Sequence, residues 1–559
     1  MLRFSSHNIF KFSIQLVVVI LLFSRFLYLD QDVPSYMVSG ISQEDESYYS
    51  IGGLLRYYND VGKTDPNFNT TSSDLVCLYS TPLTYLSFHL FGNNYWGLRF
   101  GVPFISLIVV FFLFKISCKE LKNDSFSKYF LLCFLLSDFY FFTFCRFQTP
   151  QIYSILILSF SLFCFYYIKN INKQLFVVSF LAISSILFVY IYNVFFALGV
   201  CSYYLIFIIN QKNFKLIIPL FLGGITAFIL FLITIALLGS TLEDYLNIFI
   251  TFNSKRSAFS IESNFGISTI IISGLKNLSS VFFTNLFRYN NIWLFFLIFY
   301  FTYRFKEIFY KGFKLIKSDL LLVIILCAFF QSIFLNSYPF KKWIVLLPIV
   351  FCFGLEFFKK NNNSEKNKSV LISILLTIPL VIYSYKLNYS VNYWNSFNYG
   401  YYANLSFFIS IIPLLVFGIF SFLILVKSNL KIMYTGFSFC IILMFLIISN
   451  VYYINKKFEI RDYLTDIRPL LEGNYLIDGF PHSYSLYTNS VPILNPYSFN
   501  SEKYSFDKLY LQYDDKKKYL LFKKMRGDLF FYNKIDSSKL TLLDTKHLLY
   551  YDLKLYELK

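Results

Sequence analysis

Long apolar runs constrain this chain more than any other feature of its sequence. About thirteen stretches between residues 12 and 454 are apolar over roughly the 17–25 residues that a membrane-crossing helix needs. Only 15% of the residues are charged, against about 25% in soluble domains, so the chain lacks the charge to cover an ordinary aqueous surface. The sequence therefore predicts an all-α polytopic membrane protein and excludes disorder or nucleic-acid binding as its main role. The predicted spans are 12–29, 96–114, 129–144, 152–168, 175–190, 191–209, 216–238, 290–303, 320–336, 343–358, 370–385, 404–426 and 432–454.

The distribution of basic residues predicts how these spans are oriented. With the N-terminus in the cytoplasm, the short inner segments hold 21 Lys and Arg residues and the longer outer loops hold 10. Cytoplasmic loops of membrane proteins carry the excess of Lys and Arg. We therefore expect a cytoplasmic N-terminus, and an odd number of spans then places the C-terminus on the extracytoplasmic side. Because no retention signal ends the sequence, we expect a bacterial inner membrane, with the endoplasmic reticulum as the alternative.

Three outer segments stand out, of which two, 30–95 and 455–559, are large enough to fold. Residues 30–95 form the first, and residues 239–289 form a second, with the pattern of an amphipathic helix at the membrane interface. Residues 455–559 contain short alternating runs, which predict strands with intervening helices and hence a small extracytoplasmic α/β domain. Asp478, His482 and Tyr484 in this domain could be read as catalytic residues, but the interpretation we favour is a surface turn that follows a strand. The chain is thus divided into a transmembrane domain, 1–454, and a C-terminal domain.

Three adjacent acids follow the first span: Glu44, Asp45 and Glu46 precede a stretch with apolar residues at helical spacing. Two interpretations are open. Carboxylates at a helix start are favoured by the helix dipole, so the cluster fits a solvated N-terminal turn. It equally fits a general base or a metal-binding carboxylate at the outer membrane face, where it would deprotonate an acceptor hydroxyl or amine during group transfer.

Basic residues near the outer ends of spans are candidates for binding an anionic lipid head group. Arg99 lies at the start of the second span, Arg146 follows the third, and Lys341 and Lys342 precede the tenth. Lysine binds phosphate as a point charge and arginine through a planar fork. The alternative for the two lysines is that they extend to the head groups without a specific ligand.

Several motifs, in this order along the chain, resemble the GT-C membrane glycosyltransferases of family 39, the aminoarabinose-transferase and protein O-mannosyltransferase type. The first is a DE-x-x-Y motif after the first span, made by Asp45, Glu46, Ser47, Tyr48 and Tyr49. The second is an apolar helix opened by Thr81-Pro82-Leu83 and followed by Phe91-Gly92-Asn93 and Gly97-Leu98-Arg99-Phe100. Further matches are Arg146 with Pro150 before the fourth span, and the lysines before a proline-containing span in 336–358.

The resemblance implies a fold, an activity and a set of site residues. A GT-C-like enzyme with about thirteen helices would move a sugar from a polyprenyl-phosphate carrier to a lipid, glycan or protein acceptor on the extracytoplasmic face, with inversion. Asp45 is then the first candidate for the base and Glu46 the second. The implied phosphate-binding residues are Lys341, Lys342, Arg146 and Arg99, and the implied supporting residues are Tyr48, Tyr49, Pro82 and Gln151.

Two departures from the family pattern bear on the chemistry. Thr149 or Gln151 occupies a position where relatives often have an acid, and Thr81 stands where aminoarabinose-type enzymes have a lysine. If relatives use that acid to hold a divalent metal, this chain lacks the ligand, so the use of a metal is left open. The missing lysine suggests a different donor head group.

Two further functions remain open at this stage. A lipid-linked-glycan transporter or flippase would also have many spans and basic outer residues, but it would not need the DE-x-x-Y motif. An inactive scaffold with the same fold is suggested by the uncharged residues at 149–151. Donor binding without turnover would identify the scaffold.

Overall fold

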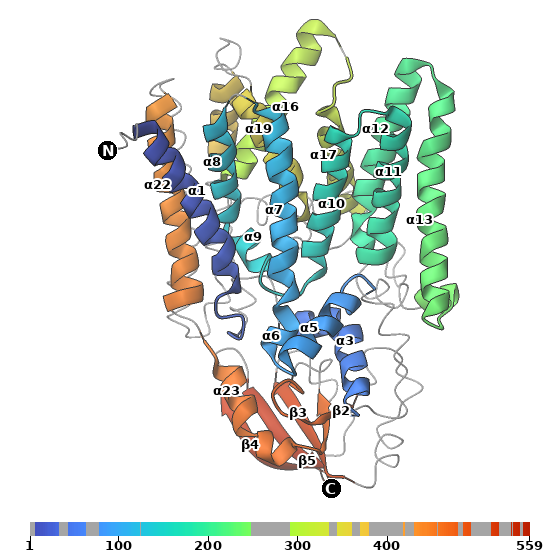
Figure 1. Cartoon of the computed structure of the whole chain (residues 1–559), viewed down its shortest axis with the longest axis vertical. Helices are drawn as coiled ribbons and strands as arrows, with labels where there is room; N and C mark the ends of the chain where they lie inside the picture. Colours follow the sequence, from blue (N-terminus) through green and yellow to red (C-terminus); the bar gives the residue numbers. More distant parts are fainter. Residues whose placement is uncertain are drawn as a thin grey trace.

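The apolar runs fold into helices that lie side by side as a bundle, with a small β-sheet beyond one end of it (Figure 1). The N-terminus lies at the far end of the bundle, and the C-terminus lies in the sheet (Figure 1). Three short helices lie between the bundle and the sheet. The structure is a computed structural model, and it describes residues 6–32, 43–62, 78–122, 124–246, 291–312, 314–334, 344–359, 369–379, 418–419, 430–454, 457–478, 484–493, 516–524, 538, 540–547 and 552–558.

Among the described residues, six helices are long and apolar enough to cross a membrane, and four shorter apolar helices accompany them. Their bounds overlap the predicted spans, and the near-contiguous fifth and sixth spans are indeed separate helices. The predicted span 404–426 lies almost wholly outside the described residues, so the count of thirteen stays a prediction. The bundle helices are α1 (Ser6–Phe23), α7 (Gly101–Glu120), α8 (Ser125–Leu136), α10 (Pro150–Tyr167), α11 (Ile171–Ser184), α12 (Val194–Gln211), α13 (Ile217–Leu237), α16 (Asn291–Lys311), α17 (Asp319–Phe334), α19 (Leu347–Lys359) and α22 (Leu430–Ser449).

The third predicted span is broken in two. Helix α8 ends at Leu136, and a short helix, α9 (Phe139–Phe144), follows. Asp138 begins α9, because its carboxylate accepts a hydrogen bond of 2.8 Å from the Phe141 N–H, a donor that the first turn of a helix leaves unpaired. The same side chain accepts a hydrogen bond of 3.2 Å from the indole N–H of Trp293. After α9, the Arg146 side chain donates hydrogen bonds to the Ser24 and Tyr28 carbonyl oxygens, which directly follow α1.

Close helix contacts in the bundle depend on small residues, as is usual where lipid and protein are equally apolar. Helix α13 packs against α11 at Gly223. A Cβ atom at this position would lie 2.1 Å from the Ser179 hydroxyl oxygen and 2.3 Å from the Phe176 carbonyl oxygen. Only glycine allows this approach.

The three short helices beyond the bundle are α3 (Gln43–Asp60), α5 (Thr81–Phe91) and α6 (Tyr95–Arg99). Pro82 lies in the first turn of α5, where a missing N–H costs nothing, so its role there is to start the helix. Helix α3 crosses α5 at Gly53, where a Cβ atom would lie 2.7 Å from the Tyr85 nitrogen. Helix α6 runs directly into α7, so α6 is tied to the bundle.

In the described part of the chain after residue 457, two helices precede five strands. The helices are α23 (Glu459–Asp466) and α24 (Arg468–Leu471). The strands form one mixed sheet in the order β2-β1-β3-β5-β4, parallel among the first three and antiparallel in the last two pairings. Apolar residues of α23 pack on the sheet around Leu476 and Leu553. We call this part the C-terminal segment; its strands are β1 (Tyr475–Asp478), β2 (Val491–Ile493), β3 (Lys518–Lys524), β4 (Leu540–His547) and β5 (Asp552–Leu558).

Some predictions fall outside the described residues. Most of the loop 239–289 does, and so do Lys341 and Lys342. The backbones of Asp45, Tyr48 and Tyr49 belong to α3, but their side chains are not among those described. One expectation is wrong: the turn at Tyr484 is not at the surface, since the Tyr484 side chain is only 1% exposed.

Candidate active site

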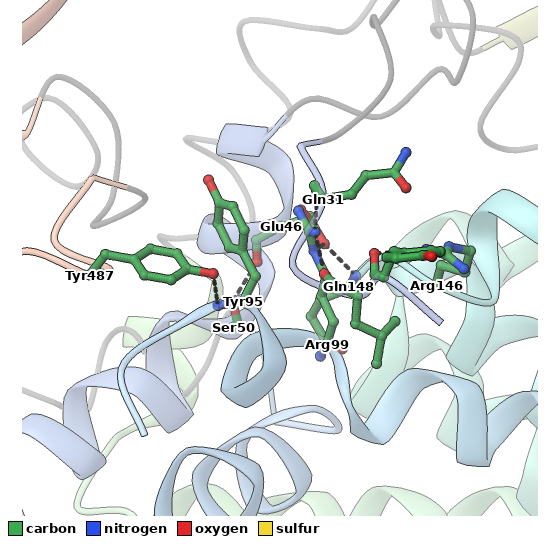
Figure 2. Close-up of polar contacts among 10 residues, drawn as sticks. Gln31, Glu46, Ser50, Tyr95, Arg99, Arg146, Gln148 and Tyr487 are labelled. Atoms are coloured by element: carbon green, nitrogen blue, oxygen red, sulfur yellow. Dashed lines mark hydrogen bonds and ion pairs between the residues drawn. The ribbon is translucent and has the colours of Figure 1, made fainter. Parts of the chain in front are cut away.

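A buried ion pair joins two of the sequence motifs that follow α1, the one that contains Glu46 and the one that contains Arg99. The Arg99 guanidinium donates to both Glu46 carboxylate oxygens, with Nε–Oε1 2.9 Å, Nε–Oε2 3.2 Å and Nη2–Oε2 2.6 Å (Figure 2). Both side chains are fully buried. A bidentate pair of this kind fixes direction as well as distance. The first turn of α3, which carries Glu46, is therefore held against the end of α6.

The remaining contacts of Arg99 also come from the protein. Its Nη1 donates to the Leu29 carbonyl oxygen at 2.7 Å and to the Gln31 carbonyl oxygen. The rings of Tyr95 and Phe147 lie 4.3 Å and 4.6 Å from the guanidinium carbon. An arginine has five N–H donors, and at least four of them are used here. The expectation that Arg99 binds a lipid phosphate conflicts with this geometry, because the phosphate would have to displace Glu46.

The Glu46 carboxylate also has its hydrogen-bond partners within the protein. Besides Arg99, its Oε1 accepts a hydrogen bond of 3.0 Å from the backbone N–H of Gln148. The side-chain amide of Gln148 donates a hydrogen bond of 2.9 Å to the Tyr153 hydroxyl oxygen. A carboxylate with this set of donors is stabilised in its charged form and is a poor proton acceptor. The second choice for a general base, Glu46, is therefore better explained as the anchor of α3. The sequence carried no signal for Gln148, since its contribution is a backbone N–H.

Arg146 has a different environment. Its side chain is 1% exposed. It donates hydrogen bonds to three carbonyl oxygens of the stretch that follows α1: Ser24 at 3.2 Å, Arg25 at 3.3 Å and Tyr28 at 3.0 Å. Among the described residues no carboxylate is bonded to it, and its Nε has no hydrogen-bond partner. A buried guanidinium without an anionic partner is costly. It is the kind of group that an anionic ligand would neutralise.

Arg25 adds a second positive charge next to Arg146. Its guanidinium donates to the Leu21 carbonyl and, at 3.0 Å, to the Leu136 carbonyl. Its carbon lies 5.1 Å from the Phe142 ring, and that of Arg146 lies 5.4 Å from the same ring. Like Arg146, it has an Nε without a partner among the described residues. The two arginines place two buried positive charges near one ring at this end of the bundle.

The positions that depart from the family pattern lie beside this cluster. Thr149 and Gln151 are buried at the start of α10, and Thr149 Oγ1 and Gln151 Oε1 accept no hydrogen bond from the described residues. Neither group is anionic. Among the described residues, no three His, Cys, Asp or Glu side chains come together in a way that could hold a metal ion. The side chains in the described part of the chain therefore do not fit a metal centre.

The described helices form an apolar bundle with the buried Glu46–Arg99 pair at one end and a sheet beyond it, which is the arrangement of a membrane protein. Two crystal structures share it across the chain: ArnT from Cupriavidus metallidurans bound to undecaprenyl phosphate and the same protein in the apo state. The first has a TM-score of 0.58 at 12% identity and covers 97% of both chains. The second has a TM-score of 0.56 at 11% identity and covers 99% of this chain and 98% of that one. No family model matches the sequence, and no curated protein matches it.

The likeness establishes the fold of an integral membrane protein of the ArnT type. ArnT is an aminoarabinose transferase of GT-C family 39, so the fold agrees with the resemblance carried by the motifs. The match also spans the C-terminal segment, since almost the whole length of both chains is aligned.

Proposed function

We propose that this protein is a membrane glycosyltransferase that moves a sugar from a polyprenyl-phosphate carrier to an acceptor lipid, glycan or protein. The Glu46–Arg99 pair carries the proposal. It fixes the first turn of α3, and with it position 45, at the end of the bundle where Arg146 and Arg25 are buried. A carboxylate and an uncompensated positive charge at one membrane face are what transfer from a phosphate donor needs. The solved ArnT bound to undecaprenyl phosphate supports a carrier of this class.

In this proposal Asp45 is the general base, and Glu46 holds the first turn of α3 in place. Adjacent positions of a helix differ by about 100°, so position 45 does not share the face that Glu46 turns to Arg99. Asp45 takes the proton from the acceptor hydroxyl or amine. The acceptor atom attacks the anomeric carbon from the side opposite the phosphate, the bond from that carbon to the phosphate oxygen breaks, and its electron pair leaves with the polyprenyl phosphate. The configuration of the sugar is inverted.

The leaving phosphate needs positive charge. We assign this role to Arg146, supported by Arg25, because among the described residues neither guanidinium forms an ion pair with a carboxylate. Lys341 and Lys342 remain candidates for the same phosphate on the evidence of the sequence. Tyr48, Tyr49 and Gln151 remain proposed supporting residues.

The proposal includes the topology predicted by the basic residues. The N-terminus lies in the cytoplasm, and the C-terminal segment is an extracytoplasmic α/β domain, 455–559, in a bacterial inner membrane. The loop 239–289 lies at the outer interface. Acceptor and base then meet on the extracytoplasmic side, where no nucleotide sugar is present.

A transfer assay tests the proposal. The protein is reconstituted in nanodiscs with a panel of radiolabelled polyprenyl-phosphate sugars and cell-envelope acceptors. Replacing Asp45 by Asn should lower transfer by roughly 10²–10⁴-fold, because it removes the proton acceptor but keeps the size of the side chain. Glu44→Gln makes the same charge change one residue away and should retain activity.

Three outcomes would count against the assignment. Full activity of Asp45→Asn removes Asp45 from the mechanism. Loss of transfer on adding EDTA would establish a metal that the described side chains do not predict. Saturable binding of the carrier without transfer of any sugar would favour the transporter or the inactive scaffold, and a flipping assay in proteoliposomes would then separate those two.

A further inference from the structure

The C-terminal segment contacts residues that lie on two sides of Arg99. On one side, the short stretch after α1 supplies the two carbonyls that accept hydrogen bonds from Arg99, Leu29 and Gln31. The next residue in this stretch is Asp32. On the other side lies Tyr95, whose ring stacks on the Arg99 guanidinium. Both Asp32 and Tyr95 are held by the C-terminal segment.

Asp32 caps a helix of the C-terminal segment. Helix α23 begins after Phe458, which has no side chain able to cap it. Asp32 Oδ2 accepts a hydrogen bond of 3.0 Å from the Ile460 N–H, and the Asp32 N–H donates 2.8 Å to the Lys457 carbonyl. A carboxylate at a helix N-terminus satisfies an unpaired donor and is favoured by the helix dipole. The cap of α23 thus comes from a residue more than 400 positions earlier in the chain.

Tyr487 makes the second connection. Its hydroxyl accepts a hydrogen bond of 3.1 Å from the Tyr95 N–H, and the two rings lie 5.2 Å apart at 84° (Figure 2). Its own N–H donates 3.0 Å to the Asn93 carbonyl. Tyr95 is the first residue of α6, so its N–H has no partner within that helix. Tyr487 supplies one.

The turn around Tyr487 is part of the core of the first outer loop. Leu486 is 1% exposed and belongs to the apolar cluster that α3, α5 and α6 share, with Leu54 and Phe88 among its members. The Tyr58 hydroxyl donates 2.9 Å to the Ser485 hydroxyl oxygen. A turn buried in this way cannot move without disturbing α3 and α6.

We infer that the C-terminal segment is a positioning element for the reaction. Asp32 and Tyr487 hold the two sides of Arg99, Arg99 holds Glu46, and Glu46 holds the first turn of α3 on which Asp45 stands. This inference rests on the proposed function for its catalytic consequence, but the mechanical coupling can be measured without activity. Misplacing a catalytic group by about 1 Å is enough to cost about 100-fold in rate.

The test uses full-length protein in nanodiscs and two variants at the separate contacts. Asp32→Ala removes the cap of α23, and Tyr487→Phe removes the acceptor for the Tyr95 N–H but keeps the ring. Hydrogen exchange of the backbone amides at 47–55, in α3, should become about five-fold faster in each variant, the effect of one lost cap. In the transfer assay the kcat should fall roughly 10- to 100-fold, with the KM for the donor changed by less than about three-fold.

Two further variants separate positioning from a general loss of structure. Asp32→Asn keeps an oxygen that accepts the Ile460 N–H and should restore both readouts. Arg468→Gln removes an exposed ion pair with Glu472 within the C-terminal segment, away from Arg99, and should leave both unchanged. Exchange at 47–55 that stays at the wild-type rate in Asp32→Ala and Tyr487→Phe overturns the inference, and so does a wild-type kcat in both.

The design distinguishes this inference from the proposed function. If the wild-type protein transfers no sugar, or if Asp45→Asn remains active, the proposed function fails. The exchange measurement still decides the coupling between the C-terminal segment and α3. If exchange rises as expected but kcat does not fall, the segment stabilises the loop without positioning the base, and the inference is overturned.

Discussion

The buried arginines of the site differ in how their charge is compensated. Arg99 shares its charge with Glu46 through two hydrogen-bonded carboxylate oxygens, whereas among the described residues Arg146 and Arg25 form no such ion pair and donate to backbone carbonyl oxygens. Removing an ion from water costs several kcal/mol, and an opposite charge offsets that cost. Arg99 therefore fits a structural role, and the other two fit the binding of an anion that the protein itself does not supply.

Asp32 offers a test of buried charge at the level of one residue. Burial raises its pKa from the usual 3.8 to about 6, although the Ile460 N–H and the Arg99 charge oppose the rise. Because the folded pKa is the higher one, the contribution of Asp32 to stability is fully present below pH 3.8. It is lost as the pH rises through 6. A pKa rise of this size corresponds to a change of ~3 kcal/mol in the free energy of unfolding between low and high pH.

We therefore expect Asp32→Asn to remove part of the pH dependence of stability between pH 4 and 7. An asparagine keeps the hydrogen bond to α23 without the buried charge, so the variant should be at least as stable as the wild-type protein at pH 7.5. Thermal unfolding in detergent at a series of pH values measures this. A difference between the two proteins that is the same at every pH would contradict the assignment.

At the scale of elements, glycine decides how closely the helices of the bundle approach. Two adjacent glycines of α13 differ in this respect. At Gly223 a Cβ atom would lie 2.3 Å from the Phe176 backbone oxygen, but at Gly224 the nearest atom is Ile183 Cγ1 at 3.5 Å. The first distance requires the two helices to separate, and the second is an ordinary contact.

Gly223→Ala should therefore destabilise the bundle by about 1–3 kcal/mol, the usual cost of overpacking. Gly224→Ala adds the same methyl group one residue away and should be neutral or stabilising by up to ~1 kcal/mol, because alanine is the better helix former. Melting temperatures of the two variants in detergent measure the difference. Equal melting temperatures would mean that α11 and α13 do not approach as closely as described.

The elements were the most predictable part of the structure. A run of apolar residues of the right length has few options in a membrane other than a helix, so the bounds of α10 and α12 agree with the expected spans. The break at Asp138 was not predicted, since it depends on a cap and on the distant Trp293. Local pattern cannot report a partner that is far away in the sequence.

For the candidate site, the sequence proposed individual residues but not their contacts, and the functional roles of those residues stay predictions. The motifs pointed to Glu46 as a possible base and to Arg99 as a phosphate ligand. They did not predict that the two side chains form an ion pair. Gln148 contributes through its backbone, which every residue has. The contacts of Tyr487 and Asp32 join segments hundreds of residues apart, so they follow from the folded topology alone.

At the scale of the whole molecule, the two ends of the chain lie at opposite ends of the bundle (Figure 1). This arrangement suits an odd number of spans, with the site and the C-terminal segment on the same side. Two exposed residues test it. Lys169 lies in a predicted inner segment, and Arg468 lies in the C-terminal segment. Each can be replaced by cysteine and labelled with a maleimide that does not cross membranes.

We expect Arg468→Cys to be labelled in intact cells and Lys169→Cys only after the membrane is permeabilised. The physical reason is the excess of Lys and Arg in the short segments on the side of Lys169, which stay in the cytoplasm. The native cysteines define the background, which the wild-type protein measures. Labelling of both variants in intact cells would contradict the odd number of spans. Labelling of Lys169→Cys alone would reverse the orientation and place the candidate base in the cytoplasm, where nucleotide sugars are present and a lipid-linked donor is not required.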